Sequence, residues 1–152
     1  MPAAPAKASR QTTIKFGFTR AARLALPADF VAALRQRPTV RSRTFALHLR
    51  RRAASFPWRF GLVVAKRFEA RSVGRNAIKR TWREALRVVA PTLEKAAPSH
   101  DLVVRLLAKP ARSDLRLLRA DCRAEAERLL DELQQKLPGI SQETACAASS
   151  SS

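Results

Sequence analysis

The chain has little of what disulfide-rich and metal-binding proteins depend on. Its 152 residues include two cysteines and two histidines. Cys122 falls within a helical pattern and Cys146 within a polar segment, so their number and setting do not indicate a disulfide scaffold. No CxxC or HxxxH spacing occurs, which argues against a zinc or iron site. We therefore expect no metal site in the protein.

The sequence also lacks the motifs of common enzyme chemistry. It contains no Walker loop, no GxGxxG fingerprint and no nucleophile elbow. Only 12 residues are acidic, and they form no local cluster that could hold a catalytic Mg²⁺. We therefore expect no catalytic residue in the protein itself.

Long apolar runs are missing as well. No stretch reaches the ~18 apolar residues that a bilayer-spanning helix needs. The first residues, "MPAAPAKASRQTTIKFGF", lack the apolar core of a secretory signal. The sequence therefore predicts no membrane partner and a cytoplasmic location.

What the chain has in excess is positive charge. Thirty Lys and Arg residues oppose the 12 acids, which gives a formal net charge of +18. Basic residues at this density usually neutralise phosphate, so nucleic acid is the first partner to consider. Arg accounts for 23 of the 30, however, and a GC-rich coding bias by itself raises the Arg and Ala content. The charge therefore suggests a partner without proving one.

Composition divides the chain into one domain and two tails. Residues 1–20 predict a mobile basic tail, and residues 138–152, "PGISQETACAASSSS", predict a disordered polar tail. The segment 21–137 between them is long enough for one compact core but not for two. It contains no internal repeat.

Hydrophobic periodicity predicts seven elements within this domain. A short helix begins near Pro27, a brief strand near Val40, and "TFALHLR" alternates as a strand with one buried face. "RFGLVVAKR" is apolar on both faces, which predicts a central strand. A helix over residues 72–90 has Ser72 as its expected N-cap and Pro91 as its stop, and "DLVVRLLAK" forms a further strand.

A long final helix completes the pattern. It opens at Ser113 or Asp114 and ends at Pro138 and Gly139. The resulting order, αβββαβα, predicts an α/β (α+β) two-layer sandwich, with helices covering one face of a four-stranded sheet and the other face open.

The helix over residues 72–90 separates its apolar and basic side chains. At about 100° per residue, one arc of roughly 140° collects the side chains expected to dock. They are Ile78, Thr81, Trp82, Ala85, Leu86 and Val89. A neighbouring arc of similar width presents Arg75, Asn76, Lys79, Arg80, Arg83 and Arg87. The one acid, Glu84, lies beyond the basic arc, whereas a merely solvated face usually mixes both charges. This favours a phosphate-binding surface over a solvated face.

The same helix carries a family resemblance. "GRNAIKRTWREALR" resembles the signature of the bacterial ribonuclease P protein subunit, in which an Arg-Asn-Arg core precedes Ile-Lys-Arg and Arg-Glu. "LPADF", "FALHL", "RFGLVVAKR" and "DLVVRLLAK" resemble the family's first helix and three of its strands, so the likeness covers roughly residues 24–136. It implies an uncommon left-handed βαβ crossover, although the general rule predicts a right-handed one.

The resemblance also implies a function. In this family a large catalytic RNA, with Mg²⁺ bound mainly by RNA, hydrolyses a phosphodiester of precursor tRNA while the protein assists. The implied partners are ribonuclease P RNA and precursor tRNA, and no protein partner is evident. Arg75, Asn76, Lys79, Arg80 and Arg83 would contact the catalytic RNA or lie near its junction with the leader, and Lys66 and Arg67 would border the same surface.

A second surface follows from the resemblance alone. The cleft between the first helix and the sheet would hold the single-stranded 5′ leader, lined by Phe30, Leu34, His48, Val63 and Ala65. Phe30 and Leu34 fit a plain core role equally well, and His48 fits an exposed strand histidine or a residue that stacks on a base.

Further expectations concern single positions and rival functions. Ala77 stands where the family usually has Arg, at the margin of the basic arc, so we expect an arginine there to be structurally silent. Arg50, Arg51 and Arg52 predict a solvated or generally electrostatic patch. A ribosomal protein or ribosome assembly factor would explain the charge but not the joint occurrence of "GRNAIKR" and "GLVVAKR". A self-sufficient nuclease would need an acid cluster or a histidine pair, which the sequence does not visibly supply.

Overall fold

The computed structural model of the protein describes residues 22–52, 58–97 and 99–150, and for 139–150 the backbone alone. Its elements are α2 (Pro27–Arg35), β1 (Val40–Arg41), β2 (Phe45–Arg51), β3 (Arg59–Val63), α3 (Ser72–Ala96), β4 (His100–Leu106) and α4 (Leu115–Ser150). This is the predicted αβββαβα order. The predicted N-terminal tail, residues 1–20, lies outside the described residues.

The four strands form one sheet in the order β1-β2-β4-β3. β2 pairs antiparallel with β1 and β4, and β3 pairs parallel with β4. The prediction that β3 is central is therefore wrong, because the central strands are β2 and β4. β3 is apolar because both its faces are covered. The amide of Leu24 also donates to the carbonyl of Phe60 at 3.0 Å, so the chain before α2 shields part of its edge.

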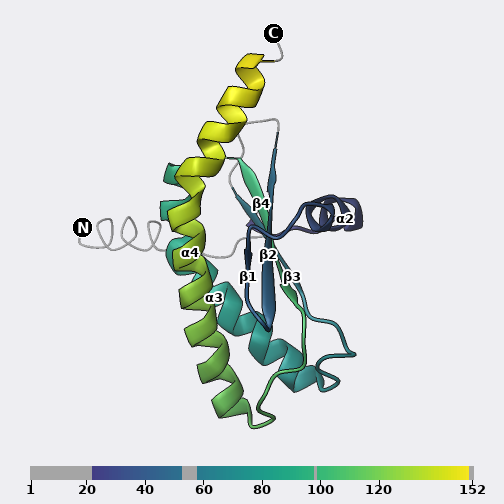
Figure 1. The fold of residues 1–152 in the computed structure, drawn as a ribbon. Coiled ribbons are helices and arrows are strands. Elements are labelled where there is room, and N and C mark those ends of the chain that lie inside the picture. Colours follow the sequence, from purple (N-terminus) through teal and green to yellow (C-terminus); the bar gives the residue numbers. More distant parts are fainter. Residues whose placement is uncertain (1–21, 53–57, 98, 151–152) are drawn as a thin grey trace, which may run out of the picture.

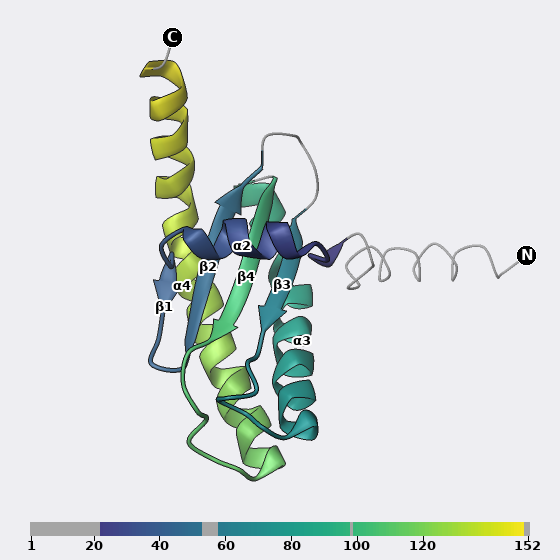
Figure 2. The ribbon, with the colours of Figure 1, turned by 90° about the vertical axis from the view of Figure 1, so that its right-hand side faces the viewer.

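The connection from β3 through α3 to β4 is left-handed, as Figure 2 shows when the chain is followed from one strand to the other. The fold class and the crossover expected from the resemblance are thus confirmed, against the usual right-handed rule. Among the described residues, no helix combines the length and the apolar character that crossing a bilayer requires.

Helices cover both faces of the sheet. α3 and α4 lie on one face and α2 on the other (Figure 1). The expectation of an open second face is wrong where α2 lies, and β2 shows this directly. Its outward-facing Ala46 and His48 are 0% and 4% exposed, although their alternation with Phe45 and Leu47 predicts a solvated side.

The helix ends differ from the prediction at both prolines. α3 continues through Pro91 to Ala96, and α4 continues through Pro138 to Ser150, so neither proline is a stop. A proline removes one backbone hydrogen bond and strains the preceding turn, but neighbouring contacts can hold the helix together. In α3 the residue that follows this turn, Leu93, is 0% exposed and anchors the last turns in the core.

Of the two predicted helix starts, the one of α4 is confirmed and the one of α3 is wrong. The side chain of Asp114 accepts the amide of Leu117 at 3.0 Å and caps α4, as predicted. Ser72 is the first residue of α3 rather than its N-cap, because Arg71 holds the cap position.

Candidate nucleic-acid interface

The predicted RNA contacts on α3 all reach the surface. Asn76 and Arg80 are exposed, and Arg75, Lys79, Arg83 and Arg87 are half-buried. On the docking side, Ile78, Trp82 and Leu86 are at most 1% exposed and belong to the main core. The helical pattern therefore predicts the rotation of α3 correctly for these residues.

Position 77 departs from the pattern. Ala77 is 2% exposed, and its carbonyl accepts the hydroxyl of Thr81 at 2.8 Å. A wheel with a single docking side misses this burial because α3 has neighbours on two sides, the sheet and α4 (Figure 1). The expectation that an arginine at position 77 is structurally silent is wrong, since its guanidinium would have to be buried or the helix displaced.

Arg75 is partly engaged in shaping the start of α3. Its Nη1 donates to the carbonyls of Glu69 and Ala70, at 3.1 and 2.7 Å. The buried carboxylate of Glu69 accepts the side-chain Nε and the backbone amide of Arg71, and the side-chain hydrogen bond is the main cause that lowers the pKa of Glu69. Gly74 makes room for this carboxylate, because a Cβ there would lie 2.5 Å from Glu69 Cδ.

Lys66 and Arg67 lie in the loop that leads into α3. β3 ends at Val63, so neither residue belongs to the strand in which the sequence pattern placed them. Both are exposed, and the guanidinium carbon of Arg67 lies 4.6 Å from the centroid of the Phe68 ring. This loop adds two exposed cations on the approach to the basic helix.

The half-buried cations of α3 meet the chain before α2 at a small cavity. Lys79, Arg83 and Arg23 line this space of about 160 Å³, and the rest of the lining is Leu24, Phe30, Phe60, Gly61 and Leu62. None of the residues described in the lining is acidic. Burial lowers the pKa of Arg83, and the positive charges of Arg23 and Arg80 lower it further. A bound anion would relieve this repulsion. We call Arg23, Lys79 and Arg83 the cation cluster.

Arg87 and Arg80 differ in whether their side chains form ion pairs with other described residues. Arg87 forms an ion pair with Glu84, one turn earlier, and this hydrogen bond raises the pKa of Arg87. Arg80 forms no hydrogen bond or ion pair with any residue that the structure describes. Of the two, Arg80 is the better placed to bind an external anion.

The predicted leader cleft is occupied by packed side chains. Phe30, Leu34 and Val63 are half-buried and pack against Leu24, Ala33 and Val103, where α2 crosses the sheet (Figure 2). These six residues form what we call the α2 cluster. Ala65 lies beyond the end of β3 and is not part of it. The structure thus brings three of the five predicted lining residues together.

His48 is buried beneath the end of α2. Its Nδ1 lies 2.9 Å from the carbonyl of Gln36, so the proton is assigned to Nδ1, which donates to this oxygen. Its Nε2 is buried and has no hydrogen-bond partner among the described residues. With the side chain in this position, His48 cannot stack on a base unless α2 moves.

Phe30 sits directly on the backbone of β3. A Cβ at Gly61 would lie 2.5 Å from Phe30 Cε1 and 3.2 Å from Leu24 Cδ2. Only glycine allows the ring to approach the strand this closely. The Gly61 contact therefore fixes α2 next to the cation cluster.

An ion-pair network that the sequence analysis missed attaches α2 to the sheet. Arg59 donates from Nε and Nη2 to the two carboxylate oxygens of Asp101, both at 2.8 Å, and Asp101 is 0% exposed. The hydrogen bond to Asp101 is the main cause that raises the pKa of Arg59. Asp29 of α2 lies 3.3 Å from Arg59 and 3.4 Å from Arg50, and Arg52 lies 3.8 Å from Asp101.

Arg50 and Arg52, predicted as a solvated patch, are therefore organised around buried or half-buried carboxylates. The signal that could have found them lies in strand register. Asp101 stands opposite both Arg50 of β2 and Arg59 of β3. This relation appears only when all three strands are aligned.

Neither a metal centre nor a reactive thiol emerges from the described residues. No group of three or more His, Cys, Asp or Glu side chains among them could hold a metal ion. Burial raises the pKa of the Cys122 thiol to about 12, so this side chain is not a nucleophile at neutral pH.

Comparisons with known proteins point to one family. The model of the family described as Ribonuclease P matches residues 18–134. The chain is 40% identical over 110 residues to the ribonuclease P protein component of Bordetella parapertussis, an alignment that covers 70% of this chain and 86% of the relative. It is 37% identical over 117 residues to that of Ralstonia pickettii, with 75% and 80% covered.

A solved structure agrees in fold. The RNase P protein of Staphylococcus aureus superposes with a TM-score of 0.60 at 23% identity, covering 75% of this chain and 96% of that one.

Proposed function

Because the chain belongs to the ribonuclease P protein family, a family of RNA-binding subunits in tRNA processing, we propose a specific division of its surface between two RNAs. Asn76, Lys79, Arg80 and Arg83 bind ribonuclease P RNA, and Arg75 and Arg87 add charge while holding their neighbours. Lys66 and Arg67 extend this surface along the loop before α3.

We propose that the chemistry lies in the RNA. The RNA subunit, with Mg²⁺ bound mainly by RNA, would hydrolyse the phosphodiester at the 5′ end of the mature tRNA, in the cytoplasm. The protein would supply positive charge and position the substrate, without a catalytic residue of its own.

The cation cluster is the single observation that carries the proposal. Three cations from α3 and the chain before α2 converge on a cavity whose described lining contains no acid. Partial burial of Arg83 strengthens its attraction for a phosphate, because water screens the charges less. Arg forks also suit phosphate oxygens geometrically.

The cluster adjoins Phe30 and Gly61, which suggests the path of the 5′ leader. We propose that the leader leaves the cation cluster along α2 and β3, where Phe30 offers an aromatic face. Phe30, Leu34, Val63, Ala65 and His48 remain its proposed lining. His48 joins only if α2 shifts from its position over the sheet, because its ring is 4% exposed.

Salt-dependent binding tests the charged surface. If the protein neutralises ~6 phosphates, its affinity for ribonuclease P RNA should fall roughly 10³-fold between 50 and 200 mM salt. Lys79→Ala combined with Arg83→Ala should reduce the slope by about two units and leave the melting temperature nearly unchanged. The matched control, Lys95→Ala combined with Arg128→Ala, removes the same charge from exposed positions outside the cavity. Equal losses in both double variants would overturn the proposed site.

Leader length tests the second surface. Phe30→Leu should weaken holoenzyme binding of precursor tRNA that carries a leader and leave binding of mature tRNA unchanged. The loss should vanish for precursors whose leader is too short to reach α2. An equal loss with mature tRNA would show that Phe30 acts through the fold alone.

A further inference from the structure

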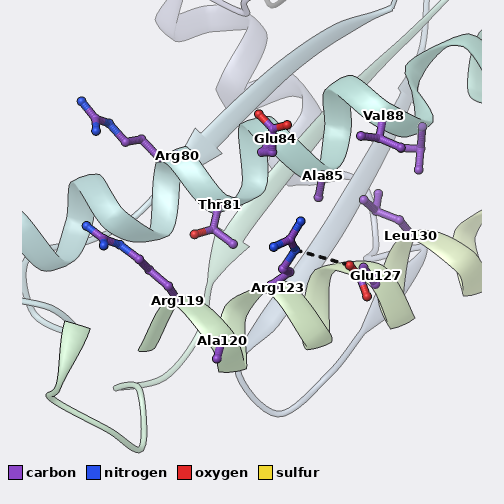
Figure 3. A pocket seen from close by; sticks show the side chains of 11 residues that line it. Arg80, Thr81, Glu84, Ala85, Val88, Arg119, Ala120, Arg123, Glu127 and Leu130 are labelled. Atoms are coloured by element: carbon purple, nitrogen blue, oxygen red, sulfur yellow. Dashed lines mark ion pairs between the residues drawn. The ribbon is translucent and has the colours of Figure 1, made fainter. Parts of the chain in front are cut away.

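A second candidate RNA site lies between α3 and α4, away from the sheet. The two helices leave a groove of about 670 Å³, within the range of ~300–1,000 Å³ typical of ligand-binding pockets. Its lining combines arginines, two glutamates and small or apolar side chains (Figure 3). They are Arg80, Thr81, Glu84, Ala85, Val88, Val89, Arg119, Ala120, Arg123, Glu127 and Leu130.

Two of these arginines are available to an external ligand. Arg80 of α3 and Arg119 of α4 extend toward the same side of the groove (Figure 3). Neither forms an ion pair or a hydrogen bond with a residue of the described ranges. Arg123 pairs with Glu127 at 3.6 Å, but both side chains are about 70% exposed, and such pairs contribute little. A phosphate can therefore compete for Arg123 as well.

The floor of the groove suits an unstacked base. Ala85 and Val89 are half-buried and contribute apolar surface, and Val88 is 66% exposed although it is a large aliphatic residue. Proteins that bind single-stranded RNA combine a basic groove for the phosphates with surfaces for unstacked bases, usually aromatic rings or guanidinium planes. In this groove the arginines can serve both purposes, and Val88 adds exposed aliphatic surface.

The closeness of the groove to the cation cluster favours a long polyanion such as RNA as the occupant. Arg80 lines the groove, and its charge also acts on Arg83 of the cation cluster. Arg80 therefore lies between the cation cluster and the arginines of α4 that line the groove. A polyanion longer than one nucleotide can therefore contact both sites at once.

We propose that this groove binds a single-stranded segment of ribonuclease P RNA, with phosphates on Arg80, Arg119 and Arg123 and a base against Ala85 and Val88. The inference rests on the proposed function and deepens it, because it adds two residues of α4, Arg119 and Arg123, to the RNA-binding surface. It also gives α4 a role beyond covering the core.

A matched pair of double variants tests the groove. Arg119→Gln with Arg123→Gln should weaken binding of ribonuclease P RNA about tenfold at 100 mM salt and lower the salt slope by roughly 1.4, the value for two single-strand phosphates. The control, Arg112→Gln with Arg128→Gln, also removes two exposed arginines, but neither lines the groove. It should stay within about twofold of the wild type.

The outcomes separate this inference from the proposed function. If the groove variant binds like the wild type while Lys79→Ala with Arg83→Ala still weakens binding, the groove proposal fails and the proposed function stands. If the groove and control variants lose the same affinity, the loss comes from the lower net charge of the protein rather than from the groove, and the groove proposal also fails. If neither the groove variant nor Lys79→Ala with Arg83→Ala changes the binding of ribonuclease P RNA, both the groove proposal and the proposed function fail.

Cross-linking identifies the occupant directly. Ala120 is exposed in the groove, so Ala120→Cys in a Cys146→Ser background can carry a photoreactive label, while the buried Cys122 thiol stays unmodified. In the holoenzyme the label should attach to ribonuclease P RNA, and the same label at Arg128→Cys should not. Adducts to a second copy of the chain, adducts confined to another protein in cell extract, or equal RNA labelling from both positions would overturn the assignment.

Discussion

The two faces of the sheet are held by different forces. On the face toward α3 and α4, one large core buries aliphatic and aromatic side chains, including Trp58 and Trp82. On the face toward α2, Leu24, Ala33 and Val103 are the described residues buried in the apolar cluster, and ion pairs complete the attachment. Apolar burial tolerates little rearrangement, whereas half-buried ion pairs can exchange partners with solvent or with a ligand.

The face toward α3 and α4 therefore supplies most of the stability of the fold, and the face toward α2 can rearrange more easily. The α3 and α4 face fixes the rotation of the basic helix, so that its cations are presented without reorganisation. The α2 face has fewer buried contacts, and such regions open at lower free energy than the core. A leader that needs space next to β3 would gain it by displacing α2 rather than by opening the main core.

The largest expected effect comes from the main core. Trp82 is 0% exposed and packs edge-to-face on Phe45, with ring centroids 5.1 Å apart. Trp82→Ala should lower the free energy of unfolding by ~3–5 kcal/mol, measured by chemical denaturation. Trp82→Phe is the control. It should cost much less, because the indole N–H has no partner among the described residues and phenylalanine removes that buried donor. Similar losses in both variants would contradict this account of the core.

Next in size is the buried end of the ion-pair network. Asp101→Asn leaves the guanidinium of Arg59 without its two-point partner and leaves three arginines close together. Because Arg59 is partly exposed, we expect a loss of ~2–3 kcal/mol, at or below the usual range for breaking a buried pair. Asp101→Asn should also weaken α2, which hydrogen exchange of its amides can report. Unchanged exchange there would show that the network does not couple α2 to the sheet.

Adding one methyl group tests the contact between α2 and β3. Gly61→Ala places a Cβ against the Phe30 ring, so the ring or α2 must shift, at a cost of ~1–2 kcal/mol. Gly61→Ala combined with Phe30→Leu should recover part of this loss, since the smaller side chain leaves room. No recovery in the double variant, measured by thermal unfolding, would place the strain elsewhere.

The smallest effect should come from the half-exposed end of the network. Asp29→Asn removes the contacts at 3.3 and 3.4 Å to Arg59 and Arg50, while Asp101 keeps its own. We expect a loss of no more than ~1 kcal/mol, because the site is partly solvated. If the α2 face is the adaptable one, Asp29→Asn should leave affinity for ribonuclease P RNA unchanged and alter only the leader-dependent part of precursor binding. A loss as large as that of Asp101→Asn would remove the contrast between the two faces.

Periodicity predicts most of the fold because local patterns carry it. The strands around Phe45 and Leu102 and the docking residues of α3, such as Trp82 and Leu86, follow from spacing alone. The wrong predictions concern residues whose surroundings depend on a second packing element. Ala77 and His48 are buried by elements that a single-sided pattern does not include, and the two prolines stay inside helices.

The candidate site could also be predicted from the sequence only in part. Sequence spacing predicts that Lys79 and Arg83 share a surface, since both lie on one side of α3. It cannot bring Arg23 to that surface or pair Asp101 with Arg50 and Arg59, because those contacts depend on how distant segments align. Arg119 escaped prediction for the same reason, since its partner across the groove, Arg80, lies on another helix.

The strand order has a consequence for how the protein is made. β4 pairs with both β2 and β3, so until His100–Leu106 has left the ribosome neither of these strands has its main partner. During synthesis, at roughly 5–20 residues per second, β3 and the basic α3 are therefore complete before the sheet that anchors them exists. The cations of α3 would meet the surrounding ribosomal RNA as part of an unfinished domain. α4 must follow as well, because Leu118, Leu129 and Leu133 complete the main core, so α3 gains its full support only after both β4 and α4 have been made.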